Sequence, residues 1–310
     1  MTDKKASYTS ADSVPMKLLT MYGREFMKSG ISAIHPQVIP TNKCNLKCSW
    51  CSCANEDMSM QLSREHINPM ADALKTYGAQ AVTITGGGEP TLYPHLDELI
   101  KTLKDLGVEV GMVTNGLRLG DHNRIDKLTW CRVSVSDDRN VATLIDTLSE
   151  IIPNHSIDWA FSYVLTNKPD YEKLKRVIRF AHKYQITHIR IVSDLLDTDN
   201  VPSPPPDILN DPIVIYQDRK TPRHGSSACR MHMIKPVIAP DLKVYTCCGA
   251  QYALREPSLK MPNELCVGHL FETIDSKPFD GSICAKCYYT EYNAILETLA
   301  CGTMKHTHFI

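Results

Sequence analysis

The chain has 310 residues, of which 43% are hydrophobic, and its formal net charge is −1. This length and composition suffice for one large α/β domain with a smaller module, and the balanced charge excludes a global attraction to nucleic acid or membranes. No segment reaches the roughly 18 apolar residues of a membrane span, and the first residues lack the apolar core of a secretory signal. We therefore expect a soluble, cytoplasmic protein with no membrane partner.

The hydrophobic pattern predicts a helix over residues 14–30 and then an alternation of strands and helices. The helix runs 95–106 and 171–184 each carry apolar residues on one face, and Gly78 and Gly107 are typical helix stops. Between the helices, six runs are typical of strands: Ala33–Pro40, Ala81–Thr85, Val108–Thr114, Cys131–Ser136, Trp159–Leu165 and Ile186–Val192.

Such alternation predicts an α/β fold, a partial (β/α)6 TIM-like barrel with helices outside its parallel sheet. Functional residues are then expected at the carboxyl ends of the strands. A proline-rich stretch, residues 198–206, breaks the alternation, and residues 237–246 around Pro240-Asp241 predict a β-hairpin. We therefore expect an N-terminal helical extension (1–32), the barrel (33–197), a linker (198–225), and a small hairpin and helix module with the C-terminal tail (226–310).

Twelve cysteines are many for a protein in a reducing compartment, where disulfides are disfavoured. Most of them fall into two groups, one following the first predicted strand and one in the last third of the chain. Within the first group, Cys44, Cys48 and Cys51 form a CxxxCxxC motif. Three thiolates can hold three irons of a [4Fe–4S] cluster and leave the fourth iron open to a small molecule. The alternative is a closed four-thiolate zinc or iron–sulfur site that includes Cys53.

This motif, with the aromatic Trp50 before its last cysteine, resembles the signature of the radical S-adenosylmethionine (SAM) superfamily. The resemblance covers roughly residues 33–195. It implies that SAM chelates the open iron and that one electron cleaves it to a 5′-deoxyadenosyl radical, which abstracts hydrogen from a substrate. It also implies an external one-electron donor such as flavodoxin or ferredoxin.

Further motifs agree with this resemblance. The second strand leads into Thr85-Gly-Gly-Gly-Glu-Pro90, similar to the family's GGE motif, so Gly87, Gly88 and Glu89 are expected to contact the methionine amino group. Thr114-Asn115-Gly116 follows the next strand and is expected to shape its loop and line the substrate side. The residues expected to contact the ribose, carboxylate or adenine lie on later strands: Ser134, Ser136, Ser162 and Val192. For Ser134 and Ser136, an ordinary role as strand residues is the open alternative.

The second cysteine group resembles the Twitch module, the shortened form of the SPASM extension of radical SAM enzymes. The resemblance implies an auxiliary [4Fe–4S] cluster on Cys229, Cys247, Cys284 and Cys287. Cys248 or Cys266 is an alternative ligand, and a zinc ribbon is an alternative site, since four cysteines in two groups also suit tetrahedral zinc. The SPASM pattern has a glycine in the hairpin turn, whereas this chain has Pro240-Asp241-Leu242.

The resulting prediction is a radical SAM oxidoreductase, or an isomerase or mutase, acting on an unactivated carbon of a small molecule, nucleotide, nucleobase or peptide. The alternative from another class is a non-catalytic metal-binding protein that interacts with nucleic acid. The segment 218–235 contains five lysines and arginines and one acid: Arg219, Lys220, Arg223, Arg230, Lys235 and Asp218. Such a basic segment suits a phosphorylated substrate, a nucleotide or a nucleic acid, and a solvated loop is its alternative interpretation.

Overall fold

The structure is a computed structural model that describes residues 33–301, except for 137–139, 220–221 and 273–276. The helix predicted over residues 14–30 lies outside the described residues. Among the helices that are described, none is both long and apolar enough to cross a bilayer.

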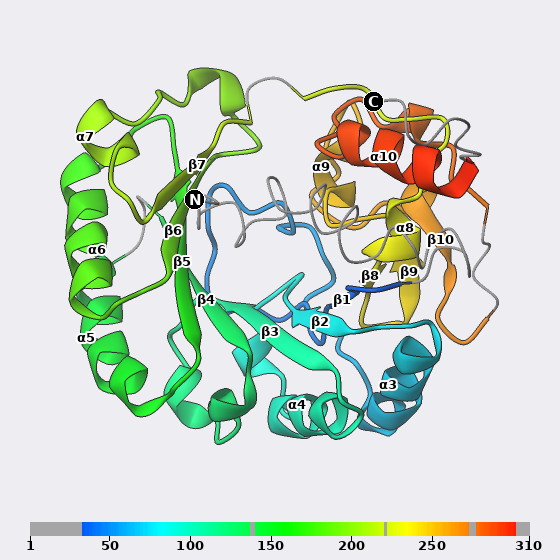
Figure 1. Ribbon diagram of the computed structural model, residues 1–310, viewed down its shortest axis with the longest axis horizontal. Helices are drawn as coiled ribbons and strands as arrows, with labels where there is room; N and C mark the ends of the chain where they lie inside the picture. The colour runs from blue at the N-terminus through cyan, green and yellow to red at the C-terminus, as the bar shows by residue number, and fades with distance from the viewer. Residues whose placement is uncertain (1–32, 137–139, 220–221, 273–276, 302–310) are drawn as a thin grey trace, which may run out of the picture.

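One curved sheet of ten strands organises this part of the chain (Figure 1). Its spatial order is β10-β9-β8-β1-β2-β3-β4-β5-β6-β7. Every pairing from β8 through β1 to β7 is parallel, whereas β9 pairs antiparallel with both β8 and β10. The strands are β1 Gln37–Val38, β2 Ala81–Ile84, β3 Glu109–Thr114, β4 Trp130–Ser136, β5 Asp158–Leu165, β6 His188–Ser193, β7 Val214–Gln217, β8 Val237–Ile238, β9 Lys243–Tyr245 and β10 Cys266–His269.

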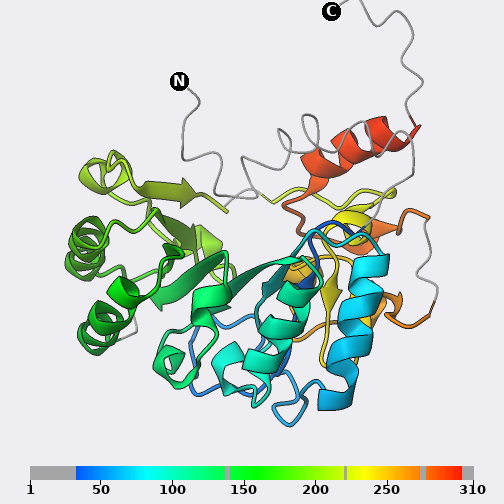
Figure 2. The ribbon, with the colours of Figure 1, turned by 60° about the horizontal axis from the view of Figure 1, so that its bottom comes forward.

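The longer helices of the barrel lie outside the curve of the sheet, as Figures 1 and 2 show for α3 to α6. The helix α10 lies at the other end of the structure, where its Tyr292 and Leu296 pack with Met231 and Ile234 of α8. The helices are α3 Ile67–Thr76, α4 Leu96–Asp105, α5 Val141–Ile151, α6 Tyr171–Lys183, α7 Pro206–Leu209, α8 Met231–Ile234, α9 Ala250–Ala253 and α10 Thr290–Cys301.

The sequence explains the position of α4. Its four buried residues, Leu96, Leu99, Ile100 and Leu103, recur at helical spacing, so they form one face that packs on the sheet. The helix ends before Gly107, which has a φ of +70°, a conformation that glycine adopts without steric cost. Burial of this apolar face holds the helix against the outer side of the barrel.

The strands divide their side chains between two environments. Along β4, Cys131, Val133 and Val135 are buried in the main hydrophobic core, which lies between the sheet and the helices. Arg132 and Ser134 alternate with them and are only partly buried, so they face the concave interior of the barrel. Along β4, the side chains that face the barrel interior are therefore polar, and those that face the helices are apolar.

The predicted α/β fold is confirmed: the structure contains all six predicted strands and the hairpin. The strand β7 was not predicted, and it lies within residues 198–225, which were expected to be a linker. The strand β8 pairs with β1, so the C-terminal hairpin continues the barrel sheet instead of standing apart from it. In the hairpin turn, Leu242 adopts a φ of +65°, which is unusual for a residue with a side chain.

Candidate active site

The cysteine loop, residues 41–56, follows β1 and lies against the loop that follows β2. The backbone amide of Gly88 donates to the carbonyl oxygen of Thr41 at 3.1 Å, and the amide of Glu89 donates to that of Lys43 at 2.8 Å. Because β1 and β2 are parallel neighbours, both loops leave the sheet at its carboxyl edge. Backbone hydrogen bonds thus join the cysteine loop to the GGGEP loop.

The close approach of these two loops requires glycine at residue 88. A Cβ atom there would lie 2.2 Å from the carbonyl oxygen of Lys43 and 2.4 Å from the backbone of Asn42. Both contacts are with backbone, which cannot rotate away. The glycines of the GGGEP run therefore serve to bring Glu89 against the cysteine loop.

Glu89 is the centre of a buried hydrogen-bond network. Its Oε1 accepts from the amide of Thr91 at 3.0 Å, the hydroxyl of Thr91 at 2.7 Å and the hydroxyl of Thr114 at 2.5 Å. Its Oε2 accepts from the amide of Asn115 at 2.6 Å. A carboxylate offers about four lone-pair positions on its two oxygens, and only one of these bonds falls on Oε2, so this oxygen retains capacity for a further donor.

The end of β3 has a role that the sequence analysis did not assign. Besides binding Glu89, Asn115 donates from Nδ2 to Oδ1 of Asn45, which lies between Cys44 and Cys48. The TNG sequence therefore fixes both the acidic side chain and the cysteine loop. The sequence signal that could have revealed this role is two consecutive polar residues, Thr114 and Asn115, at the end of the strand that follows β2.

The three cysteines of the CxxxCxxC motif lie within this loop and are partly buried, as is Trp50. The amide of Cys51 donates to the carbonyl oxygen of Cys48 at 3.2 Å. Burial raises the pKa of the Cys51 thiol, and the neighbouring Cys48 and Cys44 raise it further. Three thiols within one loop are the donor type and number that an iron–sulfur cluster with one open iron uses.

Cys53 occupies a different environment from these three. Its thiol lies 3.9 Å from the carbonyl oxygen of Gly86 and 3.7 Å from Nε2 of Gln251, and burial raises its pKa to about 12. It contacts the GGGEP loop and α9, and Cys51 is near enough to raise its pKa as well.

The residues predicted to contact the nucleoside part of SAM share the interior face. The register pairs Ser134 with Ser162, and pairs Ser136 with Val164, which in turn pairs with Val192. These residues lie toward the carboxyl ends of β4, β5 and β6. The hydroxyl of Ser162 already accepts a hydrogen bond from Nη2 of Arg190 at 3.1 Å.

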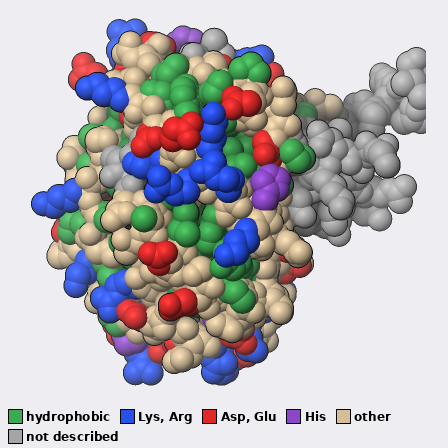
Figure 3. All heavy atoms as spheres, turned by 90° about the vertical axis from the view of Figure 1, so that its left-hand side faces the viewer, with side chains coloured by type: hydrophobic (Ala, Val, Ile, Leu, Met, Phe, Trp, Pro, Cys, Tyr) green, Lys and Arg blue, Asp and Glu red, His purple; other side chains and the backbone are tan. Residues whose placement is uncertain are grey.

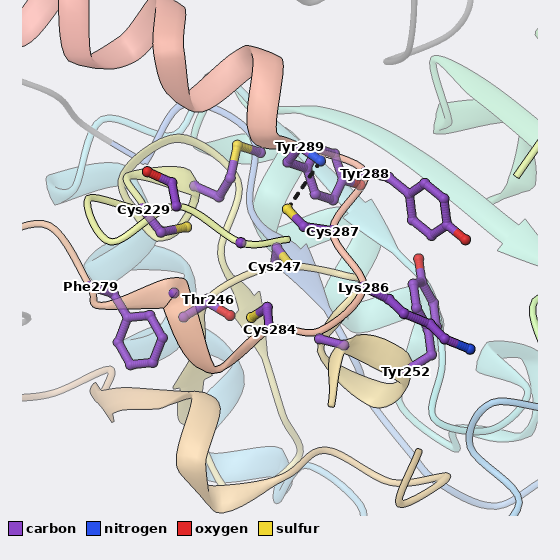
Figure 4. Close-up of a pocket in the computed structure, with 16 residues that line it drawn as sticks. Cys229, Thr246, Cys247, Tyr252, Phe279, Cys284, Lys286, Cys287, Tyr288 and Tyr289 are labelled. Atoms are coloured by element: carbon purple, nitrogen blue, oxygen red, sulfur yellow. Dashed lines mark hydrogen bonds between the residues drawn. The ribbon is translucent and has the colours of Figure 1, made fainter. Parts of the chain in front are cut away.

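The second cysteine group surrounds one cavity, shown in Figure 4. The cysteines that line this cavity are the four predicted ones, Cys229, Cys247, Cys284 and Cys287. Burial, with Cys287 and Cys229 nearby, raises the pKa of Cys284 to about 12. Three separate segments of the chain thus bring four thiols to the wall of one cavity.

The two alternative cysteines point elsewhere. The sulfur of Cys248 lies 2.8 Å from the hydroxyl oxygen of Tyr289, and neither Cys248 nor Cys266 lines the cavity. Cys266 lies on β10, where its thiol hydrogen-bonds to the carbonyl oxygen of Gly268. The geometry therefore favours Cys247 over its neighbour.

The cations of the segment 218–235 do not form one continuous basic patch. Arg223 and Arg230 pair with Glu291 and Glu297 of α10, each at 2.7 Å. Lys220 lies outside the described residues. Arg219 lies 4.6 Å over the ring of Tyr288, and Lys235 lies at the end of α8, before β8.

A curved parallel sheet with a three-cysteine loop at the carboxyl ends of its strands is the arrangement of an α/β iron–sulfur enzyme. The family model of the radical SAM superfamily matches residues 38–200, slightly more than half of the chain. The chain belongs to the radical SAM superfamily, and this family implies a [4Fe–4S] cluster and SAM.

Curated relatives resemble parts of the chain. A probable GTP 3′,8-cyclase of Sulfurisphaera tokodaii is 32% identical over 178 residues, which is 50% of this chain and 54% of that protein. An S-adenosylmethionine-dependent nucleotide dehydratase of Flammeovirga pacifica is 33% identical over 101 residues, 30% of this chain and 34% of that protein. The chain thus spans about half, or less, of the length of these relatives.

Solved structures share the fold. Streptococcus suis SuiB bound to S-adenosylmethionine superposes with a TM-score of 0.57 over 83% of this chain and 73% of that chain, at 16% identity. The structure of anSMEcpe with bound AdoMet gives a TM-score of 0.56 over 85% of this chain and 83% of that chain, at 12% identity. These similarities extend beyond the residues that the family model matches.

Proposed function

We propose that this chain is a radical SAM enzyme that abstracts hydrogen from an unactivated carbon of a phosphorylated small molecule, leading to its oxidation or rearrangement. The observation that carries the proposal is the joint anchoring of the cysteine loop by the GGGEP and TNG loops at the carboxyl edge of the sheet. An external one-electron donor, such as flavodoxin or ferredoxin, is part of the proposal.

Cys44, Cys48 and Cys51 would hold the cluster. A [4Fe–4S] cluster bound there supplies the electron that cleaves SAM to a 5′-deoxyadenosyl radical. Glu89 would receive the methionine ammonium group on Oε2, the oxygen with spare acceptor capacity. Thr91, Thr114 and Asn115 hold this carboxylate in place before SAM arrives, which lowers the cost of ordering it on binding.

We also propose that Cys229, Cys247, Cys284 and Cys287 hold an auxiliary [4Fe–4S] cluster, in a Twitch-like arrangement. The single cavity that these side chains line supports it. Four thiolates complete the coordination of such a cluster, so it would serve electron transfer or structure and would not bind substrate through an open iron. Zinc bound by the same four thiolates is the alternative that metal analysis decides.

The names of the relatives support a nucleotide as substrate. Both the cyclase and the dehydratase are named for chemistry on a nucleotide. Substrate binding in this chain would use the polar interior face of the barrel, below Ser134 and Ser136.

The test is anaerobic reconstitution with iron and sulfide, followed by reduction in the presence of SAM. The wild-type protein should bind about eight irons and form 5′-deoxyadenosine, because each cluster holds four irons. The variant with Cys44, Cys48 and Cys51 all replaced by alanine should retain about four irons and form none. Cys131→Ala is the matched control, since Cys131 is buried in the main core and belongs to neither cysteine group.

Unchanged 5′-deoxyadenosine formation in the triple variant would overturn the proposal. One zinc per chain in that variant, in place of four irons, would overturn the auxiliary cluster but leave the SAM site standing.

A further inference from the structure

Three cations lie in the interior of the barrel, nearer the amino ends of the strands than the residues proposed to bind SAM. Arg132 lies on β4 two residues before Ser134, and Arg190 lies on β6 in register with Ser162. Lys235 follows α8 and precedes β8. Arg190 lies on β6, near one end of the strand order, and Lys235 precedes β8, near the other end, yet the charge of Arg190 acts on Lys235.

The three side chains are close enough to affect one another electrostatically. Burial lowers the pKa of Arg132, and the charge of Arg190 lowers it further. The pKa of Lys235 is lowered by burial first, and also by Arg132 and Arg190. Gathering like charges in a partly buried place costs free energy, so an additional interaction must stabilise it.

No carboxylate supplies that interaction, and the only acidic group that raises the pKa of all three is the thiol of Cys248. Within the part of the chain that the structure describes, none of the three forms an ion pair, and the buried Nε atoms of Arg132 and Arg190 have no hydrogen-bond partner. As whole residues, the three are partly buried, although the Nε atoms of both arginines are inaccessible to solvent.

The outer surface behaves differently. Figure 3 shows the face that α6 helps to form, where basic and acidic side chains lie next to one another. There Lys175 pairs with Asp207 at 3.0 Å and with Glu172 at 3.5 Å. On this face the exposed Lys175 is paired with two acids, whereas Arg132, Arg190 and Lys235 form no ion pair among the described residues.

We propose that Arg132, Arg190 and Lys235 form an anion site that holds the phosphate groups of a polyphosphorylated substrate. This inference rests on the proposed function and adds the residues and the substrate class. Three cations suit several negative charges better than a single carboxylate, and guanidinium groups match the geometry of phosphate oxygens.

The position of the site also fits a substrate of nucleotide length. Arg132 and Ser136 are four residues apart on β4, which at about 3.3 Å per residue separates their Cα atoms by about 13 Å. A nucleoside polyphosphate held at Arg132 by its phosphates extends toward the carboxyl edge of the sheet. Its sugar and base would then lie near the place where the radical forms.

The experiment measures binding of inorganic tripolyphosphate and of GTP to the reconstituted enzyme by calorimetry. Both should bind to the wild-type enzyme, and tripolyphosphate should compete with GTP. Arg132→Met and Arg190→Met keep side-chain length and remove the charge, so each should weaken binding by about 10- to 100-fold, the range for loss of a charged hydrogen bond. Arg179→Met, on the exposed face of α6, makes the same change in net charge and should leave binding unchanged.

Lysine at these positions is the second pair of variants. Arg132→Lys and Arg190→Lys keep the charge, so they should retain most of the tripolyphosphate affinity, and they guard against a methionine variant that fails to fold. The inference is wrong if tripolyphosphate does not bind at millimolar concentration, or if it binds the methionine variants as tightly as the wild type.

Two further outcomes would also overturn the inference, since each assigns the cations to another anion. One is loss of SAM affinity in the methionine variants with tripolyphosphate binding unchanged, which would assign the cations to the SAM carboxylate. The other is loss of iron from the Cys229 site with tripolyphosphate binding unchanged, which would make them counterions of that site. Failure of the wild type to form 5′-deoxyadenosine would instead reject the proposed function.

Discussion

Replacement of Glu89 by glutamine is the sharpest test of the network that holds the two loops together. The carboxylate accepts four hydrogen bonds, three on Oε1 and one on Oε2. A glutamine amide keeps one acceptor oxygen and places an NH2 group where the second oxygen was. In the better of its two orientations, the NH2 group would face the amide of Asn115, so a donor would meet a donor.

The expected loss follows from that count. Removing one charge-assisted bond costs about 1.5–3 kcal/mol, and leaving the buried amide of Asn115 unsatisfied costs about 1–3 kcal/mol more. Glu89→Gln should therefore destabilise the protein by about 3–5 kcal/mol. At about 2 °C per kcal/mol for a chain of this size, the unfolding midpoint should fall by roughly 6–10 °C.

The assay is thermal unfolding of the metal-free protein at one fixed scan rate, because metal loss would otherwise add a second transition. Thr114→Val removes the hydroxyl that donates to Glu89 and accepts from the amide of Gly116, so it should cost about 1.5–3 kcal/mol. Glu98→Gln is the matched control: Glu98 forms an exposed ion pair with Arg64 at 2.8 Å, and such pairs contribute less than about 1 kcal/mol. Equal midpoints for Glu89→Gln and Glu98→Gln would refute the reasoning.

Three further variants test the local packing. Gly88→Ala should destabilise the protein by about 1–3 kcal/mol because the added Cβ would overlap the backbone of the cysteine loop. Gly120→Ala is its control and should be neutral, since the added Cβ would meet only Ile151 at 3.9 Å. Equal unfolding midpoints for the two variants would contradict this expectation. Leu242→Gly relieves about 1–2 kcal/mol of backbone strain but loses a buried side chain worth about 2.7–5 kcal/mol, so urea unfolding should show net destabilisation, and a gain in stability would count against it. Cys53→Ser should leave the iron content per chain unchanged, since its thiol contacts Gly86 and Gln251; loss of about four irons would place it among the ligands.

The sequence alone determined the alternation of strands and helices and the positions of the cysteines. Apolar periodicity reports which face of an element is buried, and this information is local, so the six barrel strands and the helices α4 and α6 could be predicted. The CxxxCxxC and GGGEP motifs could be recognised for the same reason, because each lies within a few consecutive residues.

Only the tertiary structure decided which distant residues meet. The pairing of β8 with β1, the bonds from Thr114 and Asn115 to Glu89, and the gathering of four cysteines around one cavity all depend on strand order and on how the sheet curves. The same holds for Arg132, Arg190 and Lys235, which are separated by up to about a hundred residues in the sequence. Sequence periodicity shows that a side chain faces the interior, but not which side chains from other strands face it there, because that depends on strand order, register and curvature.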